Sequence, residues 1–233
     1  MDEMSAAVRA ALLEVLIHGE LPRAEIAHLS RASLTRITRQ LVDDGFLIEG
    51  ETRLMAQTGR PSEMLALRAE ARHFLGIKLT GDRLYAVVTD LSATIVASAD
   101  HALVSSDPAD VVAQIVDVAA QYRGQWPDLV AIGIAIAGRV AKHPDGAVVE
   151  ESGFLQWTDV PLGALVADAT GLPCAVENDV QALTATEHWF GAGAGIDNMA
   201  LIPVGAGIGC GLVLGGHVVE GAQDDTVQVT LSD

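Results

Sequence analysis

The sequence predicts a multi-domain α/β protein, from its supply of apolar residues and from a change of hydrophobic period near Phe74. The 233-residue chain is 50% hydrophobic and contains 23 glycines, so it can bury a sizeable core. Before Phe74 apolar residues recur mainly at helical spacing, whereas after it strand-like runs alternate with helical patterns. We therefore expect one domain over residues 1–70 and a second over residues 71–233.

The first domain reads as three helices followed by a β-hairpin. Ser5 is placed to cap a helix with an apolar face, and Gly19 is placed to end it. Two shorter helices are expected over residues 22–30 and 31–45, with Pro near the first turn of one and Gly after the other. Two short strands around a polar loop then predict a hairpin within residues 46–68. This arrangement is typical of a winged helix-turn-helix that binds DNA.

The expected third helix presents hydroxyl and guanidinium groups opposite its apolar face. The net charge is −17, but residues 1–75 hold nine of the 14 Lys and Arg residues, for a net of −2, against −15 in residues 76–233. Phosphate binding needs a local basic patch and does not need a chain that is basic on average. Because no aromatic residues that could stack on bases are interleaved with these arginines, binding of single-stranded nucleic acid is not expected. A helical bundle with a solvated charged face is the alternative. The candidate DNA-binding residues are Arg23, Arg31, Ser33, Thr35, Arg36, Thr38 and Arg39.

The sequence of the second domain predicts strands and helices in a recognisable order. Three strand-like runs come first, followed by a helix capped by Asp107 and a strand that is apolar on both faces. Residues 138–160 read as a loop that carries Trp157, and a helix, a strand and a further helix follow. The β-β-β-α-β-α-β order matches a ribonuclease H-like lobe. Two strands joined by a glycine turn, within residues 199–219, would begin a second such lobe.

The stretch "VENDVQAL", residues 176–183, places polar residues where a strand becomes a helix. Asn178 and Asp179 at such a point can form a helix cap, a ligand clamp or a catalytic base. An aspartate at position 179 would satisfy free N–H groups of the following turn, so we expect Asp179 to cap the helix. Capping and ligand binding can coexist.

Taken in order, these segments resemble the ROK family, which comprises bacterial sugar-responsive repressors and sugar kinases of the actin/hexokinase-like ATPase superfamily. The resemblance runs from about residue 5 to 222. It is carried by "RASLTRITRQLVDDGFL", Gly59-Arg60-Pro61, "GIAIAG", "WTDVPLGALVADATGLPCAVENDVQAL", "EHWFGAG" and "VGAGIGCGLVLGGHVVEGA".

The resemblance implies roles for particular residues. The family's sugar clamp and catalytic base correspond to Asn178 and Asp179, and the glycine that lines its sugar pocket corresponds to Gly138, although Ala137 stands where proline is usual. Asp179 would accept a hydroxyl proton in a kinase, or only a hydrogen bond in a sensor. A second phosphate loop corresponds to the turn that contains Gly205, Gly207 and Gly209. A hairpin turn that needs glycine for its geometry is the alternative.

The first phosphate loop departs from the family's kinases. Their Asp-x-Gly-Gly-Thr pattern is replaced, so that Lys78 stands for the Asp, Thr80 for the first Gly and Asp82 for the Thr. A lysine repels Mg²⁺ and Asp82 would repel the γ-phosphate, and phosphoryl transfer depends on positioning and charge neutralisation. We therefore expect no catalytic residue, no ATP or Mg²⁺ as cofactor, and no kinase activity.

A second departure lies after Ala222, where the family continues with a Glu-x-Gly-His motif and a cysteine-rich zinc site. The first lobe is expected over residues 71–178, the start of a second lobe over 179–222 and an atypical tail over 223–233. The second lobe is thus expected to be incomplete, from a fragment boundary, a truncation or a frameshift. No metal ligand is predicted.

The resemblance implies a cytoplasmic, sugar-responsive regulator, most simply a repressor of carbohydrate genes. The expected partners are double-stranded operator DNA, a sugar or sugar-phosphate effector, and further copies of the chain in a homodimer or higher homo-oligomer. No membrane partner is expected, because no uncharged apolar run reaches the roughly 20 residues of a membrane span. The alternatives are a sugar kinase with a fused regulatory domain and a non-functional remnant.

Overall fold

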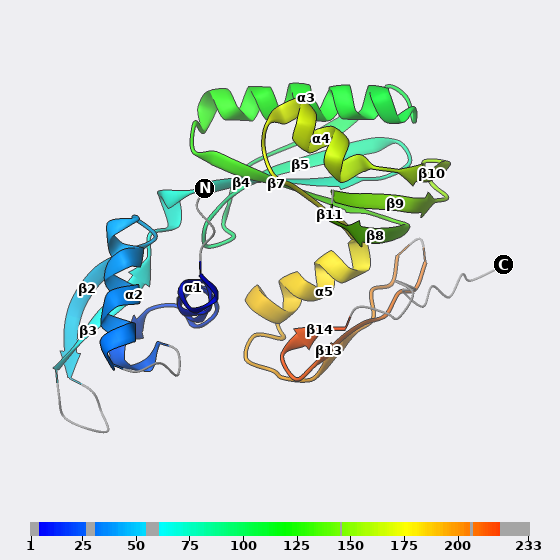
Figure 1. Cartoon of the computed structure of the whole chain (residues 1–233). Helices are drawn as coiled ribbons and strands as arrows, with labels where there is room; N and C mark the ends of the chain where they lie inside the picture. Colours follow the sequence, from blue (N-terminus) through cyan, green and yellow to red (C-terminus); the bar gives the residue numbers. More distant parts are fainter. Residues whose placement is uncertain (1–4, 27–30, 55–60, 145, 206, 220–233) are drawn as a thin grey trace. The chain divides into compact units, whose positions relative to one another are not determined.

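The computed structural model divides into two compact units (Figure 1). Residues 1–71 with residues 90–92 form the N-terminal unit, and residues 72–89 with residues 93–233 form the C-terminal unit. The structure describes residues 5–26, 31–54, 61–144, 146–205 and 207–219.

In its described residues the N-terminal unit contains two α-helices. α1 (Ala6–His18) begins where the Ser5 hydroxyl accepts a hydrogen bond from the Val8 N–H at 3.4 Å, as the sequence predicts. It ends at Gly19, whose φ of +76° lies in the region that favours glycine. α2 (Arg31–Asp43) matches the expected third helix.

A three-stranded antiparallel sheet completes the N-terminal unit, with strand order β1-β3-β2. β1 is Leu21–Pro22, β2 is Leu47–Leu54 and β3 is Pro61–Leu67. The helices and the sheet enclose an apolar core made of Val8, Ala11, Val15, Ile26, Leu34, Ile37, Leu41, Leu47 and Leu65.

The helix expected over residues 22–30 is wrong at its start. Leu21 and Pro22 pair with β3, and only Arg23–Glu25 forms a short 3₁₀ turn, η1. Pro22 has ψ of +136°, an extended conformation, because the chain leaves a strand at that point. Residues 27–30 of the expected helix lie outside the described residues.

The C-terminal unit is built on a five-stranded sheet with order β11-β7-β4-β5-β6. β4, β7 and β11 are parallel neighbours, and β6 runs antiparallel to β5. β4 and β7 are rich in Leu and Ile, but their buried residues mostly alternate with partly or fully exposed ones, so one face of each strand is buried more deeply than the other. The strands are β4 (His73–Leu79), β5 (Arg83–Asp90), β6 (Ile95–Ala102), β7 (Leu129–Ile136) and β11 (Cys174–Asn178).

Two helices pack together over one face of this sheet (Figure 1). α3 (Pro108–Gln125) begins at Asp107, whose carboxylate accepts a hydrogen bond from the Ala109 N–H at 2.9 Å. α4 (Leu162–Thr170) ends at Gly171 in the left-handed conformation. The predicted β-β-β-α-β-α-β order is therefore confirmed, with one exception.

The exception is the segment expected to be a loop, residues 138–160. It forms a second antiparallel sheet of three strands, β8 (Arg139–His143), β9 (Gly146–Ser152) and β10 (Trp157–Val160), in the order β10-β9-β8. Only a few of its residues are apolar and buried, so the two-residue period was hidden among polar and charged ones. Trp157 is 3% exposed, and its indole N–H donates to the Ser106 carbonyl oxygen at 2.6 Å.

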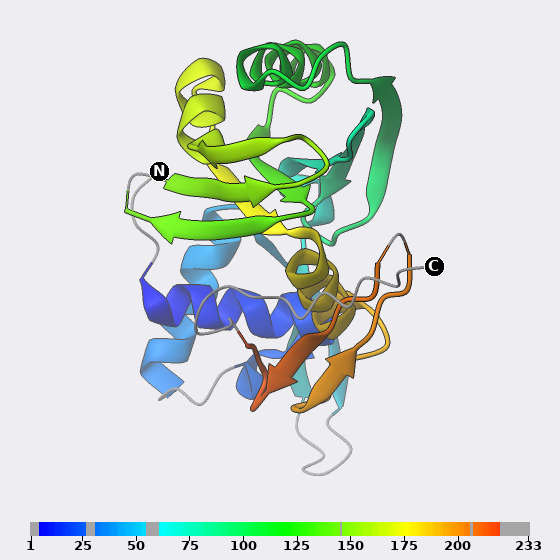
Figure 2. The same ribbon diagram turned by 90° about the vertical axis from the view of Figure 1, so that its right-hand side faces the viewer.

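The chain continues from β11 into α5 (Asp179–Phe190) and then into a small antiparallel sheet. Figure 2 shows the strands of this sheet alongside α5. At Gly211 a Cβ atom would collide with the Thr184 side chain, so a strand backbone lies directly on the helix. The strands are β12 (Met199–Leu201), β13 (Gly211–Leu214) and β14 (His217–Val218).

Within the described ranges, every helix is too short or too polar to cross a membrane.

Candidate functional site

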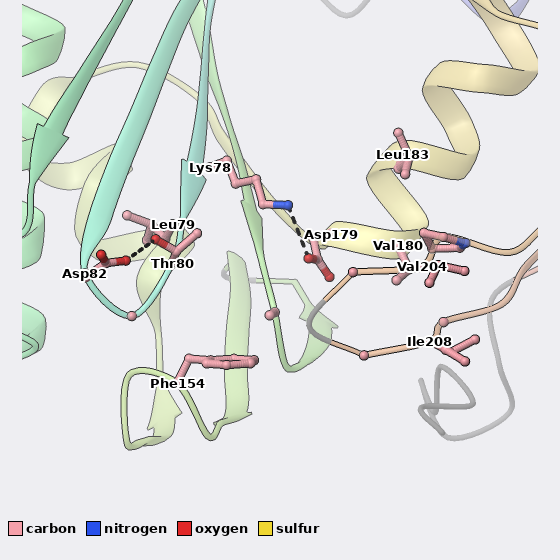
Figure 3. Close-up of a pocket in the computed structure, with 16 residues that line it drawn as sticks. Lys78, Leu79, Thr80, Asp82, Phe154, Asp179, Val180, Leu183, Val204 and Ile208 are labelled. Atoms are coloured by element: carbon pink, nitrogen blue, oxygen red, sulfur yellow. Dashed lines mark hydrogen bonds and ion pairs between the residues drawn. The ribbon is translucent and has the colours of Figure 1, made fainter. Parts of the chain in front are cut away.

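A cavity of about 780 Å³ opens in the C-terminal unit at the carboxyl ends of the parallel strands (Figure 3). This edge is where open α/β sheets commonly bind ligands. Its walls come from the β4–β5 turn, from Ala137 after β7, from the turn between β9 and β10, from the start of α5 and from residues 203–205 and 207–209. Segments far apart in the sequence therefore meet at one site.

An ion pair crosses the cavity (Figure 3). The ammonium Nζ of Lys78, at the end of β4, lies 3.5 Å from Oδ2 of Asp179, at the start of α5. Their side chains are 53% and 23% exposed, so water screens the pair. In this arrangement the positive charge nearest Asp179 is a lysine ammonium.

The β4–β5 turn holds a second carboxylate at the cavity. The Thr80 hydroxyl lies 3.1 Å from Oδ1 of Asp82 and accepts a hydrogen bond from the Arg83 N–H at 3.1 Å. Asp82 is exposed and lines the cavity. The turn thus presents oxygen atoms and a negative charge at the cavity.

Asn178, rather than Asp179, caps α5. Its Oδ1 accepts hydrogen bonds from the N–H groups of Val180 at 2.9 Å and Gln181 at 3.2 Å, and its Nδ2 donates to the Gly138 carbonyl oxygen at 2.8 Å. Asn178 is 4% exposed. The expectation that Asp179 is the cap is therefore wrong by one residue, because β11 extends through Asn178 and leaves Asp179 as the first helical residue.

The backbone conformation and the close packing at position 138 require glycine. Its φ is +150°, and a Cβ atom there would collide with the carbonyl oxygen of Glu151 on the neighbouring strand. Of the three residues expected to bind sugar, Asp179 lines the cavity. Gly138 and Asn178 are hydrogen-bonded to each other and are not among the described residues that line the cavity. The structure thus brings the three together but gives only one of them a cavity-facing position.

The glycine turn forms a compact hairpin. The Gly205 N–H donates to the Gly207 carbonyl oxygen at 2.9 Å, and the Gly209 N–H donates to the Pro203 carbonyl oxygen at 3.2 Å. At Gly209 a Cβ atom would meet the Val180 side chain at 2.7 Å, so glycine permits the turn to pack on α5. Close packing therefore requires glycine at position 209, whereas a Cβ atom at Gly205 or Gly207 would meet open space.

An apolar wall is the part of the cavity that sequence reasoning missed. Phe154 is 61% exposed, and Figure 3 shows its ring extending into the cavity below the Lys78–Asp179 pair. Leu183 and Val204 face the same space from other segments. The apolar "GFL" inside a segment assigned as a loop was the available signal.

The candidate DNA-binding residues fall into two groups on α2. Thr35, Arg36 and Arg39 are exposed, and Ser33 is partly exposed. Thr38 is fully buried, and its hydroxyl donates to the Leu34 carbonyl oxygen at 2.9 Å. Placing Thr38 on the exposed face is therefore wrong, because the helix turns it toward the core.

Two further candidates stand apart from these groups. Nη2 of Arg23 lies 2.7 Å from Oε1 of Glu49 and 2.8 Å from Oε2 of Glu63, so Arg23 joins η1 to the hairpin. Arg31 is the first residue of α2, and its side chain lies outside the described residues.

Comparison with known proteins identifies relatives of the chain. The DNA-binding transcriptional repressor Mlc of Escherichia coli (strain K12) is 24% identical over 210 residues, or 88% of this chain and 52% of Mlc. A putative xylose repressor of Caldicellulosiruptor sp. (strain Rt8B.4) is 26% identical over 220 residues, or 91% of this chain and 54% of that repressor. The chain spans about half the length of the curated relatives it matches.

Solved structures show the same fold. A ROK family transcriptional regulator, a homolog of the E. coli MLC protein, superposes with a TM-score of 0.78 at 24% identity, covering 95% of this chain and 58% of that one. A ROK family glucokinase from Streptomyces griseus, in complex with glucose and AMPPNP, gives 0.57 at 28% identity, with coverage of 68% and 48%. A sequence profile described as "ROK family" matches residues 74–224, well over half of the chain. The chain therefore belongs to the ROK family.

Proposed function

We propose that this protein is a sugar-responsive, DNA-binding transcriptional regulator, most simply a repressor. In this proposal the N-terminal unit is a winged helix-turn-helix in which α2 enters the major groove and the β2–β3 hairpin is the wing. The names of the related repressors and the exposed Arg36 and Arg39 on α2 support it. A homodimer would place two such units on two half-sites of an operator.

The effector would bind in the cavity beside Asp179, and the Lys78–Asp179 ion pair is the observation that carries this part. In the family's kinases an aspartate at the position of Lys78 would orient Mg²⁺, whereas here an ammonium group lies 3.5 Å from the candidate base. Asp179 then serves as a hydrogen-bond acceptor for a sugar hydroxyl. Asn178 and Gly138 position Asp179, because Asn178 caps α5 just before Asp179 and is itself held by its hydrogen bond to Gly138.

A sugar kinase is the second candidate, because a glucokinase shares the fold. The chain would then release ADP in the presence of ATP, Mg²⁺ and a suitable sugar. We expect turnover no greater than in the sugar-free control, since Lys78 would repel the metal and Asp82 would repel the γ-phosphate. Sustained sugar-dependent ADP release in a coupled assay would overturn the sensor proposal in favour of a kinase.

The DNA-binding part is tested on an operator selected from genomic fragments by the protein. Replacing Arg36 or Arg39 with Ala should weaken binding and flatten the dependence of log K on log salt by about one unit for each DNA phosphate that the variant no longer neutralises. Arg9→Ala is the matched control, because Arg9 is an exposed arginine on α1. Fluorescence anisotropy over a salt series measures both quantities. Equal affinities for all four proteins at every salt concentration would remove α2 from the interface.

The regulatory part requires that the sugar bind the DNA-competent and DNA-released states unequally. Adding the sugar that binds most tightly should therefore lower operator affinity. A saturating sugar that leaves operator affinity unchanged would contradict regulation by that sugar.

A further inference from the structure

We infer that the cavity beside Asp179 takes a neutral, unphosphorylated monosaccharide and discriminates against the corresponding sugar phosphate. The sugar would lie between the Lys78–Asp179 pair and the ring of Phe154. The inference rests on the proposed function and narrows its effector to one chemical class.

A lysine is the first group that could attract a phosphate. Lys78 is the cation among the described lining residues, and its ammonium already lies 3.5 Å from Asp179. The lining also contains the Asp82 carboxylate, so the three charged groups sum to one negative charge. A sugar phosphate carries a charge of about −1.5 to −2 at pH 7 and would enter against this field.

A helix N-terminus is the second group, because free N–H groups and the helix dipole favour anions there. At α5 the Oδ1 atom of Asn178 accepts the N–H groups of Val180 and Gln181, at 2.9 and 3.2 Å. The Asp179 carboxylate also sits in the first turn and supplies negative charge. Asn178 therefore occupies two of the first-turn donors of this helix, and its dipole already faces a carboxylate.

A glycine-rich turn is the third group, because its N–H groups can converge on a phosphate. Here the Gly205 N–H is bonded to the Gly207 carbonyl and the Gly209 N–H to the Pro203 carbonyl. A phosphate would have to break these bonds to reach these two donors. Three ways of binding an anion are thus present in outline, and groups of each already interact within the chain.

The same cavity suits an uncharged polyol. A sugar hydroxyl is both a donor and an acceptor, so one hydroxyl can donate to Oδ2 of Asp179 while accepting from Nζ of Lys78. On the open side Phe154 offers the face of an aromatic ring, whose negative quadrupole attracts the weakly positive C–H groups of a pyranose. An apolar pocket with a few placed polar groups is the usual form of a small-molecule site.

The test titrates the full chain, by calorimetry, with glucose, xylose and N-acetylglucosamine and with the 6-phosphates of glucose and N-acetylglucosamine, which keep the pyranose ring. We expect saturable binding of at least one neutral sugar. Its phosphate should bind about tenfold or more weakly, since the negative charge of the phosphate is repelled by the net negative charge of the cavity. Phe154→Ala should weaken the neutral sugar by about tenfold, and Phe154→Trp should restore it. Tyr85→Ala is the matched control, because Tyr85 is an exposed aromatic outside the described lining.

The outcomes separate this inference from the proposed function. A sugar phosphate that binds more tightly than its parent sugar, or Phe154→Ala with unchanged affinity, would overturn the inference. If that phosphate also released the operator, the regulator proposal would still stand. If neither class of sugar bound or altered operator affinity, both would fail.

Discussion

The Gly138–Asn178 junction and the Lys78–Asp179 pair lie at the same edge of the sheet but differ in how their polar groups are used. At the junction, Asn178 is 4% exposed and makes three hydrogen bonds to backbone atoms. At the pair, one long contact joins two partly exposed side chains that face a cavity. The first arrangement stabilises the fold, and the second leaves oxygen and nitrogen atoms available to a ligand.

Substitution of Gly138 should have the largest effect on stability. Gly138→Ala adds a Cβ atom at φ +150° against the Glu151 carbonyl oxygen, so the free energy of unfolding should fall by about 3 kcal/mol. Gly153→Ala is the control, because open space surrounds a Cβ atom there, and its change should stay within about 0.5 kcal/mol. Urea denaturation measures both. Equal destabilisation of the two variants would contradict the role given to Gly138.

Substitution of Asn178 should come next. Asn178→Ala removes the α5 cap and the bond to Gly138, and each is worth about 1 kcal/mol, so we expect the free energy of unfolding to fall by about 2 kcal/mol. Asn178→Ser keeps a capping oxygen without the bond to Gly138, and should recover about half of that difference. A wild-type urea midpoint for Asn178→Ala would show that the cap contributes nothing.

Asp179 should show the opposite profile, with a small effect on stability and a large one on binding. Asp179→Asn should lower the free energy of unfolding by about 0.5 kcal/mol, because a partly exposed ion pair and a first-turn carboxylate contribute little to stability. Its affinity for the best neutral sugar should fall about tenfold or more, since the variant cannot form a charge-assisted hydrogen bond. Calorimetric titration and urea denaturation of the same samples check the pair of values. A variant with reduced stability but unchanged affinity would reverse the comparison.

Ionisation of the Cys174 thiol should have the smallest effect on stability near neutral pH. Cys174 is the first residue of β11, the strand that leads into Asn178 and Asp179. Burial raises the pKa of its thiol from 9.0 to about 12. Because the folded pKa exceeds the unfolded one, the stability that this thiol contributes is fully present below pH 9 and is lost as pH rises toward about 12. At pH 8 iodoacetamide should therefore label Cys174 far more slowly than glutathione in the same tube, and quickly after unfolding in urea. Mass spectrometry measures the labelling, and a folded Cys174 that is labelled as fast as glutathione would contradict a thiol shielded by partial burial.

The order of elements in the C-terminal unit was predictable because its core strands and helices repeat apolar residues at clear periods. β4, β7 and α3 show this most plainly. The sheet made by β8, β9 and β10 was not, since its few buried residues are separated by exposed Arg, Lys and Glu. Local periodicity carries no signal when a strand is short and mostly solvated.

For the site, residue type and spacing predicted where the polar groups gather but not how they are bonded. The sequence placed Asn178 and Asp179 together, and only the geometry shows that Asn178 caps α5 and Asp179 lines the cavity. Thr38 shows the same limit on α2, where a shift of one position around the helix separates an exposed hydroxyl from a buried one. For Phe154 the apolar "GFL" was a signal of something unusual in the predicted loop, but only the structure shows that its exposed ring lines the cavity.

The glycines that lie against α5 have a mechanical consequence. At Gly209 and Gly211 the backbone rests directly on Val180 and Thr184, with no side chain of its own as a spacer. Closely packed backbones of this kind have little compressible space between them. We therefore expect α5 and the strand that contains Gly211 to move together in any rearrangement, because neither can shift toward the other without a steric clash.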